Sequence, residues 1–182
     1  MAKHLVIVNP VSGRGAGERA IPAIKGYLGA AGLDFDLART ERPGHAAELA
    51  EAAVRAGYGV VVAAGGDGTA NEVLNGLMTG GASAADRPAL GVLCVGRGND
   101  FAYGAGIPAD LAAGCRVLAG GHQRTIDVGR VTGGDFPHGR YFGNGVGIGF
   151  DAVVGFEAAK MKRLHGFPSY VVAALKTILL YY

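Results

Sequence analysis

An unbroken apolar run that ends in clustered glycines constrains this fold more than any other part of the sequence. The stretch YGVVVAA, residues 58–64, is typical of a strand buried on both faces of a parallel sheet. It is followed by Gly65-Gly66-Asp67-Gly68 and then by TANEVLNGLM, residues 69–78, which has helical spacing. A buried strand, a glycine loop and a helix in this order predict one unit of an α/β fold.

The first two-thirds of the chain repeats this alternation of strand and helix patterns. The other expected strands are residues 4–8, 33–40 and 89–95, and the other expected helices are residues 17–32, 44–57 and 107–121. Such alternation predicts βαβ units, in which a parallel sheet is covered by helices on both faces. We therefore expect a three-layer α/β domain over residues 1–121. The apolar content of 49% is consistent with a packed core and excludes a disordered chain.

The pattern changes after Gly121. Residues 125–133 and 140–154 are strand-like, and the short turn GDFPH between them predicts antiparallel pairing. Helical stretches are expected over residues 151–164 and 169–182. We place a domain boundary near residues 120–124 and expect residues 122–182 to begin a second, β-rich domain with a helical insertion.

Two features of this second part have more than one interpretation. Glycines at every second position of residues 143–149 would leave one face of a strand bare. That face would receive another backbone or a ligand. The terminal stretch SYVVAALKTILLYY is apolar and would pack within the protein, against a partner, or on lipid. If uncovered, it would drive self-association.

Bulk properties exclude several classes of function. A net charge of +2 is too small to indicate a nucleic-acid partner. Cys94 and Cys115 lie in apolar segments, so we expect reduced core thiols, and the scattered histidines do not indicate zinc. The apolar run near the N-terminus is too short for a signal peptide, and no run of roughly 18 apolar residues indicates a membrane span. We expect a cytoplasmic protein, or one attached peripherally to a membrane.

Three polar, glycine-rich loops follow three of the expected strands. They are NPVSGRGAG (residues 9–17), the GGDG loop at residues 65–68, and CVGRGNDFA (residues 94–102). Taken alone, the GGDG loop is either a plain turn or a site. Because the carboxyl ends of parallel strands meet at one edge, the three loops together predict a ligand cleft. Glycine N–H groups at helix starts would receive phosphate, and Asp67 would order Mg²⁺ directly or through water.

Several polar residues in these loops have a structural interpretation as well. Thr69 and Glu72 have the spacing of a capping box, in which each side chain bonds the other residue's backbone N–H. Asn71 is expected to contact ligand, whereas Asn75 is expected to bind neighbouring backbone. Asp100 would cap a short helix or contact ligand. The Rossmann and P-loop glycine patterns do not occur.

The motifs NPVSG, GGDGTANEVLNGL and GRGNDFA, in this order and at these separations, resemble those of the diacylglycerol kinase catalytic-domain family. Bacterial lipid kinases and sphingosine kinases belong to it, and NAD kinases and phosphofructokinases are distant relatives. TIDVGRV and FGNGVGIGFDAVV are similar to the family's entry into its second domain, so the resemblance covers essentially the whole chain. It implies an α/β nucleotide-binding domain followed by a β-sandwich domain, with ATP between them.

The resemblance also implies a set of nucleotide-binding residues. These are Asn9, Ser12, Gly13, Thr40, Gly66, Asp67, Gly68, Thr69, Asn71, Glu72, Gly96, Gly98, Asn99 and Asp100, to which we add Gly65 of the same loop. One position departs from the family, since Arg97 stands where a threonine is usual. Its guanidinium would hold a phosphate through two hydrogen bonds or would weaken ATP binding.

The resemblance implies transfer of the ATP γ-phosphoryl group to a hydroxyl of a lipid at a membrane surface. Diacylglycerol is the most typical acceptor. Asp67 would organise Mg²⁺ or act as the base, because phosphoryl transfer depends on positioning and charge neutralisation. The family's sandwich domain continues beyond Tyr182 with an acidic motif that this sequence lacks, so we expect a truncated chain. The alternatives are a catalytically incomplete nucleotide-binding fragment, which self-associates through its last helix, and a kinase for a soluble acceptor such as NAD.

Overall fold

The computed structural model describes residues 2–81, 83–161 and 167–181, and it divides into two compact units, Met1–Asn144 and Gly145–Tyr182. The elements of the first unit are β1 (His4–Val8), α1 (Ser12–Ala30), β2 (Phe35–Arg39), α2 (His45–Arg55), β3 (Val60–Gly65), α3 (Asp67–Thr79), β4 (Ala89–Cys94), α4 (Asp100–Gly104), α5 (Leu111–Gly120), β5 (Gly129–Gly133) and β6 (Phe136–Phe142). The second unit contains α6 (Phe150–Lys160) and α7 (Phe167–Tyr181).

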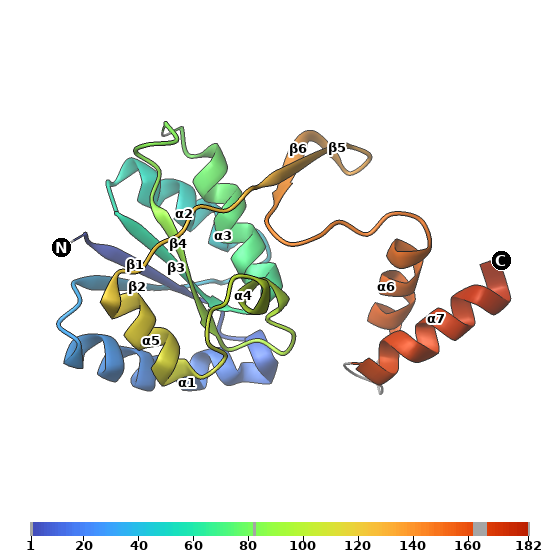
Figure 1. The fold of residues 1–182 in the computed structure, drawn as a ribbon, viewed down its shortest axis with the longest axis horizontal. Coiled ribbons are helices and arrows are strands. Elements are labelled where there is room, and N and C mark those ends of the chain that lie inside the picture. The colour runs from blue at the N-terminus through green and yellow to red at the C-terminus, as the bar shows by residue number, and fades with distance from the viewer. Residues whose placement is uncertain (1, 82, 162–166, 182) are drawn as a thin grey trace. The chain divides into compact units, whose positions relative to one another are not determined.

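A four-stranded parallel sheet forms the centre of the first unit (Figure 1). Its strand order is β2-β1-β3-β4, and every neighbouring pair is parallel. The register aligns the carboxyl ends: Val8 lies opposite Arg39 on one side and opposite Ala64 on the other. The loops that follow β1, β2, β3 and β4 therefore leave the sheet at the same edge.

Apolar side chains on both faces of this sheet build two separate cores. Leu5 and Ile7 of β1 point into the core made with α2 and α3, whereas Val6 and Val8 point into the core made with α1 and α5. Figure 1 shows α2 and α3 on one side of the sheet and α1 and α5 on the other. The two-sided burial explains why the central strand β3 is continuously apolar, whereas the edge strand β2 contains Asp36 and Arg39. It also confirms the predicted three-layer α/β arrangement.

The β5–β6 hairpin is antiparallel, as predicted from the short turn between its strands, with an irregularity between Val131 and Gly133. It belongs to the same compact unit as the parallel sheet, which ends at Asn144. The change of sequence pattern near residues 120–124 thus coincides with the end of α5. The boundary between the two compact units lies later in the chain, between Asn144 and Gly145. The assignment of residues 122–182 to the start of a β-sandwich domain stays a prediction.

The second unit is a pair of packed helices. Val154 and Ala158 of α6 pack with Ala173 of α7. Between them, the Glu157 carboxylate is only 3% exposed and accepts hydrogen bonds from Lys160 and Lys176. These two cations hold the pKa of Glu157 below its ordinary value.

The strand expected over residues 140–154 is correct only at its beginning. β6 ends at Phe142, residues 143–149 are irregular, and α6 begins at Phe150. The alternating glycines therefore do not make a bare strand face. Glycine loses much backbone entropy on ordering and offers no side chain for packing, so such a run forms a strand poorly. The end of the helix expected over residues 151–164 lies outside the described residues.

Within the part of the chain that the structure describes, no helix is long and apolar enough to cross a membrane. Cys94 and Cys115 are free thiols, as predicted, with Cys115 buried and Cys94 half-buried. Helix α7 leaves several large apolar side chains exposed, among them Leu175 and Leu179.

Candidate nucleotide-binding cleft

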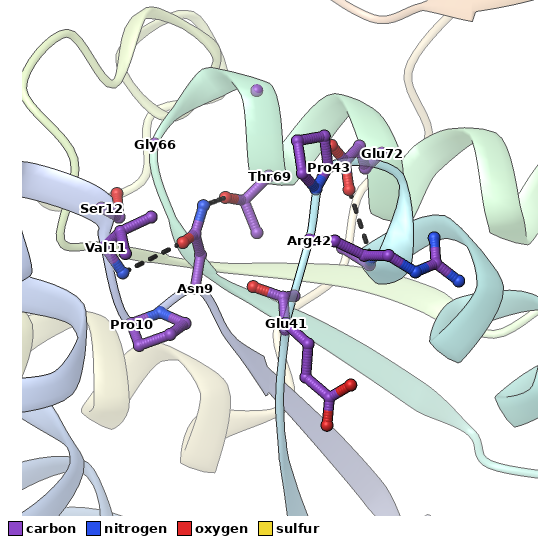
Figure 2. A pocket seen from close by; sticks show the side chains of 13 residues that line it. Asn9, Pro10, Val11, Ser12, Glu41, Arg42, Pro43, Gly66, Thr69 and Glu72 are labelled. Carbon is purple, nitrogen blue, oxygen red and sulfur yellow. Dashed lines mark hydrogen bonds between the residues drawn. The ribbon is translucent and has the colours of Figure 1, made fainter.

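A cleft of about 360 Å³ lies at the carboxyl edge of the parallel sheet (Figure 2). It is bounded by the loops that follow β1, β2 and β3. The lining residues are Asn9, Pro10, Val11, Ser12, Thr40, Glu41, Arg42, Pro43, Ala46, Gly66, Gly68, Thr69 and Glu72. Seven of these, Asn9, Ser12, Thr40, Gly66, Gly68, Thr69 and Glu72, are among the residues predicted from the sequence.

Asn9 connects the loop after β1 to helix α3. Its amide Nδ2 donates to Thr69 Oγ1 at 3.1 Å, and its Oδ1 accepts from the backbone N–H of Val11 at 3.2 Å. Figure 2 shows both hydrogen bonds. One side chain therefore fixes the spacing between the two loops that form one end of the cleft.

The turn that follows Ser12 has an uncommon backbone. Gly13, Arg14 and Gly15 all have left-handed conformations, with φ of 57°, 58° and 84°. A side chain at position 13 would also place its Cβ 2.4 Å from the carbonyl oxygen of Val95. Regular helical geometry in α1 therefore begins only after this turn, close to the predicted start at residue 17. Gly13 is not among the residues that line the cleft.

The predicted capping box at the start of α3 is wrong. The helix begins at Asp67 rather than Thr69, and its N-cap residue, Gly66, has no side chain to bond the helix. Thr69 instead accepts the hydrogen bond from Asn9, and Glu72 Oε2 accepts from the backbone N–H of Ala46 in α2 at 3.2 Å. The first N–H groups of α3 have no capping side chain, and Gly66, Gly68 and Thr69 of this helix start line the cleft. A helix N-terminus of this kind favours an anion.

The Asp67 carboxylate points to the loop after β4 and is not among the residues that line the cleft. Its Oδ2 accepts from the backbone N–H of Asn99 and its Oδ1 from that of Phe101, both at 2.9 Å. Asp67 therefore caps the short helix α4, although Asn99 and Phe101 follow it by 32 and 34 residues in the sequence. Its role toward Mg²⁺ stays a prediction.

The third predicted loop packs against the GGDG loop without reaching the cleft. A Cβ at Gly96 would lie 2.3 Å from the Gly66 Cα, so only glycine permits this approach of two backbones. Asn99 adopts a left-handed conformation as the N-cap of α4, which makes Asp100 the first helical residue and not the cap. The predicted residues that do not line the cleft are Gly13, Gly65, Asp67, Asn71, Gly96, Arg97, Gly98, Asn99 and Asp100.

Asn71 and Asn75 attach the β5–β6 hairpin to α3. Nδ2 of each donates to the carbonyl oxygen of Tyr141, and the Tyr141 N–H donates to Asn75 Oδ1 at 2.9 Å. Asn71 Oδ1 also accepts from the Arg140 guanidinium. The prediction that Asn75 binds neighbouring backbone is confirmed, and the structure gives Asn71 the same role.

The loop after β2 is a wall of the cleft that the sequence analysis missed except for Thr40. Glu41, Arg42 and Pro43 line the cleft there, together with Ala46 at the start of α2. Arg42 makes two hydrogen bonds to Glu48, at 2.9 and 2.6 Å, and this carboxylate raises the pKa of the guanidinium. The sequence feature that could have predicted this loop is TERPG, a polar stretch with proline and glycine directly after a strand.

The cleft suits a nucleotide better than a metal bound by protein groups alone. Hydroxyls of Ser12 and Thr69 and the α3 N-terminus supply hydrogen-bond donors for phosphate. Among the described residues, no group of three or more histidine, cysteine, aspartate or glutamate side chains is placed to hold a metal ion. Mg²⁺ commonly binds through one or two carboxylates plus phosphate oxygens, so a protein cluster of three ligands is not required for it.

Two relatives of similar sequence are described as diacylglycerol kinases. The diacylglycerol kinase of Staphylococcus saprophyticus is 32% identical over 174 residues, which cover 95% of this chain and 54% of that protein. The diacylglycerol kinase of Staphylococcus aureus is 34% identical, with coverage of 95% and 52%. The chain thus spans about half the length of these curated relatives.

Solved structures agree with the sequence comparison. The crystal structure of a diacylglycerol kinase from Bacillus anthracis matches with a TM-score of 0.61 and 30% identity, over 70% of this chain and 46% of that one. Residues 3–131 match the sequence family described as the diacylglycerol kinase catalytic domain. This match includes all three glycine loops and the whole cleft, and the chain belongs to the diacylglycerol kinase catalytic-domain family.

Proposed function

We propose that this chain is the nucleotide-binding part of an ATP-dependent lipid kinase, which transfers the γ-phosphoryl group to a lipid hydroxyl, with diacylglycerol as the acceptor. The observation that carries the proposal is the cleft at the carboxyl edge of the sheet, where ligands of open α/β folds bind. Membership of the diacylglycerol kinase family supports the acceptor class.

The two ends of the cleft differ in chemistry, which supports one orientation for ATP. The end at Gly66, Gly68 and Ser12 offers backbone N–H groups, a hydroxyl and a helix N-terminus, all suited to phosphate. The opposite end, at Thr40 and Pro43, offers a hydroxyl and an apolar ring, suited to the nucleoside. The phosphates would then lie beside α3, and the nucleoside against the loop after β2.

Phosphoryl transfer needs positioning and neutralisation of charge more than covalent chemistry by the protein. Mg²⁺ would supply part of that neutralisation, and Asp67 is our proposed residue for holding it, directly or through water. The loop N–H groups and the Ser12 and Thr69 hydroxyls would orient the phosphates. Because Asp67 also accepts two backbone N–H bonds, it would fix the loop after β4 at the same time.

We place the acceptor at a membrane surface, with the protein cytoplasmic and attached peripherally. The exposed apolar residues of α7, such as Leu175 and Leu179, suit contact with lipid or with a second copy of the chain. The alternative function is a nucleotide-binding fragment without catalysis, in which this face drives self-association.

A transfer assay with radiolabelled ATP separates these functions. Wild-type chain is incubated with Mg²⁺ and mixed micelles containing diacylglycerol, and in parallel with NAD. Label in the lipid that is lost in Asp67→Ala and retained in Asp110→Ala supports the proposal. Asp110 is a suitable control because it also caps a helix, by accepting from Ala113 at 2.8 Å, but lies outside the cleft. ATP binding without transfer indicates the fragment, label in NAD indicates a soluble acceptor, and absence of ATP binding contradicts the proposal.

A further inference from the structure

Glu72 makes an unusual connection between two helices. Helix α2 begins at His45 after Gly44, which has a left-handed φ of 82° and no side chain to cap the helix. The N–H groups of a first helical turn have no partner within the helix. Here the Ala46 N–H donates to Glu72 Oε2 at 3.2 Å, across 26 residues of sequence. The Glu72 carboxylate also places negative charge at the positive end of α2.

The loop that precedes α2 depends on this helix for its position. The backbone N–H of Glu41 donates to His45 Nδ1 at 3.1 Å, and the His45 N–H donates to the carbonyl of Arg42 at 3.2 Å. Arg42 is also paired with Glu48. Residues 41–43 are therefore held by contacts with α2, and a shift of the α2 start would move this wall of the cleft.

Helices α2 and α3 are in close contact near this connection. Ala46 is 1% exposed, and a Cβ at Gly76 of α3 would lie 2.2 Å from the carbonyl oxygen of Ala47. Packing sets the distance between the helix axes, while the Glu72 hydrogen bond is directed at one N–H at the end of α2. Figure 2 shows the Glu72 carboxylate extending from α3 to the beginning of α2, beside Pro43.

We propose that Glu72 is a positioning residue, which holds the loop of residues 41–43 through α2 and so shapes the nucleoside end of the cleft. This inference rests on the proposed function, because it assumes that the ligand is a nucleotide. It gives Glu72 a role other than direct contact with ATP. The loop after β2 then adopts its binding position through a hydrogen bond that originates in the phosphate-binding helix.

The test compares Glu72→Ala, Glu72→Gln and a control, Glu51→Ala, which removes an exposed carboxylate of α2 that pairs with Arg55. Amide hydrogen exchange without nucleotide measures the cap, and we expect faster exchange at Ala46 only in Glu72→Ala. A glutamine carbonyl still accepts a hydrogen bond, so Glu72→Gln should bind ATP within about twofold of wild type. Loss of the cap in Glu72→Ala should raise the Kd for ATP by about fivefold, within the range of helix-capping effects.

A second ligand distinguishes positioning from direct contact. The fold increase in Kd for Glu72→Ala should be the same with 2′,3′-dideoxy-ATP as with ATP, because positioning does not require the ribose hydroxyls. A loss seen with ATP but not with the dideoxy nucleotide would overturn the inference in favour of ribose contact. Unchanged exchange at Ala46, or equal weakening by glutamine and alanine, would overturn it as well.

The same measurements can overturn the proposed function independently of the role of Glu72. If wild-type chain binds no ATP, that function is overturned, together with the nucleotide part of this inference. If wild type and Glu72→Ala bind ATP equally well, only the role of Glu72 is overturned. Circular dichroism of each variant shows whether the total helix content is retained, and Glu72→Gln keeps the comparison informative if Glu72→Ala is unstable.

Discussion

Replacing Asp67 with alanine should destabilise the site even without any nucleotide or metal. In the structure, each Asp67 carboxylate oxygen accepts one backbone N–H bond, from Asn99 and from Phe101. Alanine removes both acceptors at once. The start of α4 and the loop after β4 then lose the connection to α3, and two N–H groups must find water instead.

The magnitude follows from the number and kind of these bonds. A hydrogen bond to a charged group contributes about 1.5–3 kcal/mol net to stability. Asp67, Asn99 and Phe101 are all half-buried, so water partly compensates the loss. We therefore expect the free energy of unfolding to fall by about 2–4 kcal/mol for the pair. For a chain of this length, that corresponds to a decrease in Tm of about 5–15 °C.

Urea and thermal unfolding of the unliganded chain measure this loss, and hydrogen exchange locates it at Phe101. Asp110→Ala is the matched control, because Asp110 caps α5 through a single N–H bond and should cost only about 1 kcal/mol. If Asp67→Ala unfolds like wild type, or no more easily than Asp110→Ala, the structural role argued for Asp67 is refuted. A loss of kinase activity in Asp67 variants would then report on the metal or on chemistry alone.

Three further predictions concern the surroundings of the cleft. Gly76→Ala should lower the free energy of unfolding by about 1–3 kcal/mol in urea titrations, because its Cβ would overlap a carbonyl of α2, and unchanged stability would contradict this close packing. Asn75→Ala should speed hydrogen exchange at the Tyr141 amide and cost about 1–3 kcal/mol, while intact protection would show that the hairpin is held elsewhere. Burial raises the pKa of the Cys94 thiol, so fewer thiolates are present at pH 8 and iodoacetamide should react several-fold more slowly than with a free thiol.

The parallel sheet was predictable because burial on both faces leaves a strong mark in the sequence. Residues 60–65 have no exposed side, so every position is apolar or glycine, and the strand at residues 89–94 has the same composition before its own glycine-rich loop. The cleft was predictable for a related reason, since polar loops at the carboxyl ends of parallel strands must meet at one edge.

The roles of individual side chains were harder to predict because their partners are distant in sequence. Thr69 and Glu72 have the spacing of a local cap, but Asn9 and Ala46 offer hydrogen bonds that only tertiary structure creates. Asp67 likewise finds its backbone partners more than thirty residues away. Local patterns compete with such contacts and cannot show which will form.

The expected strand over residues 140–154 was wrong beyond Phe142 for a different reason. Glycine at every second position resembles the alternation of apolar and polar residues that is typical of a strand. Glycine, however, supplies no side chain for packing. The loop after β2 lacks the clustered glycines of the other loops and lines the cleft with Arg42 and Pro43, so a search for glycine-rich loops does not find this wall.

The most direct test of the account is an NMR titration of the isotopically labelled chain with ATP and Mg²⁺. The account predicts saturable shifts at the amides of Ser12, Gly66 and Gly68, and at Thr40 in the loop after β2. Amides at the opposite edge of the sheet, such as Gly59, should not move. Shifts confined to that opposite edge, or no saturable shifts at the cleft, would contradict the claim that this cleft binds a nucleotide.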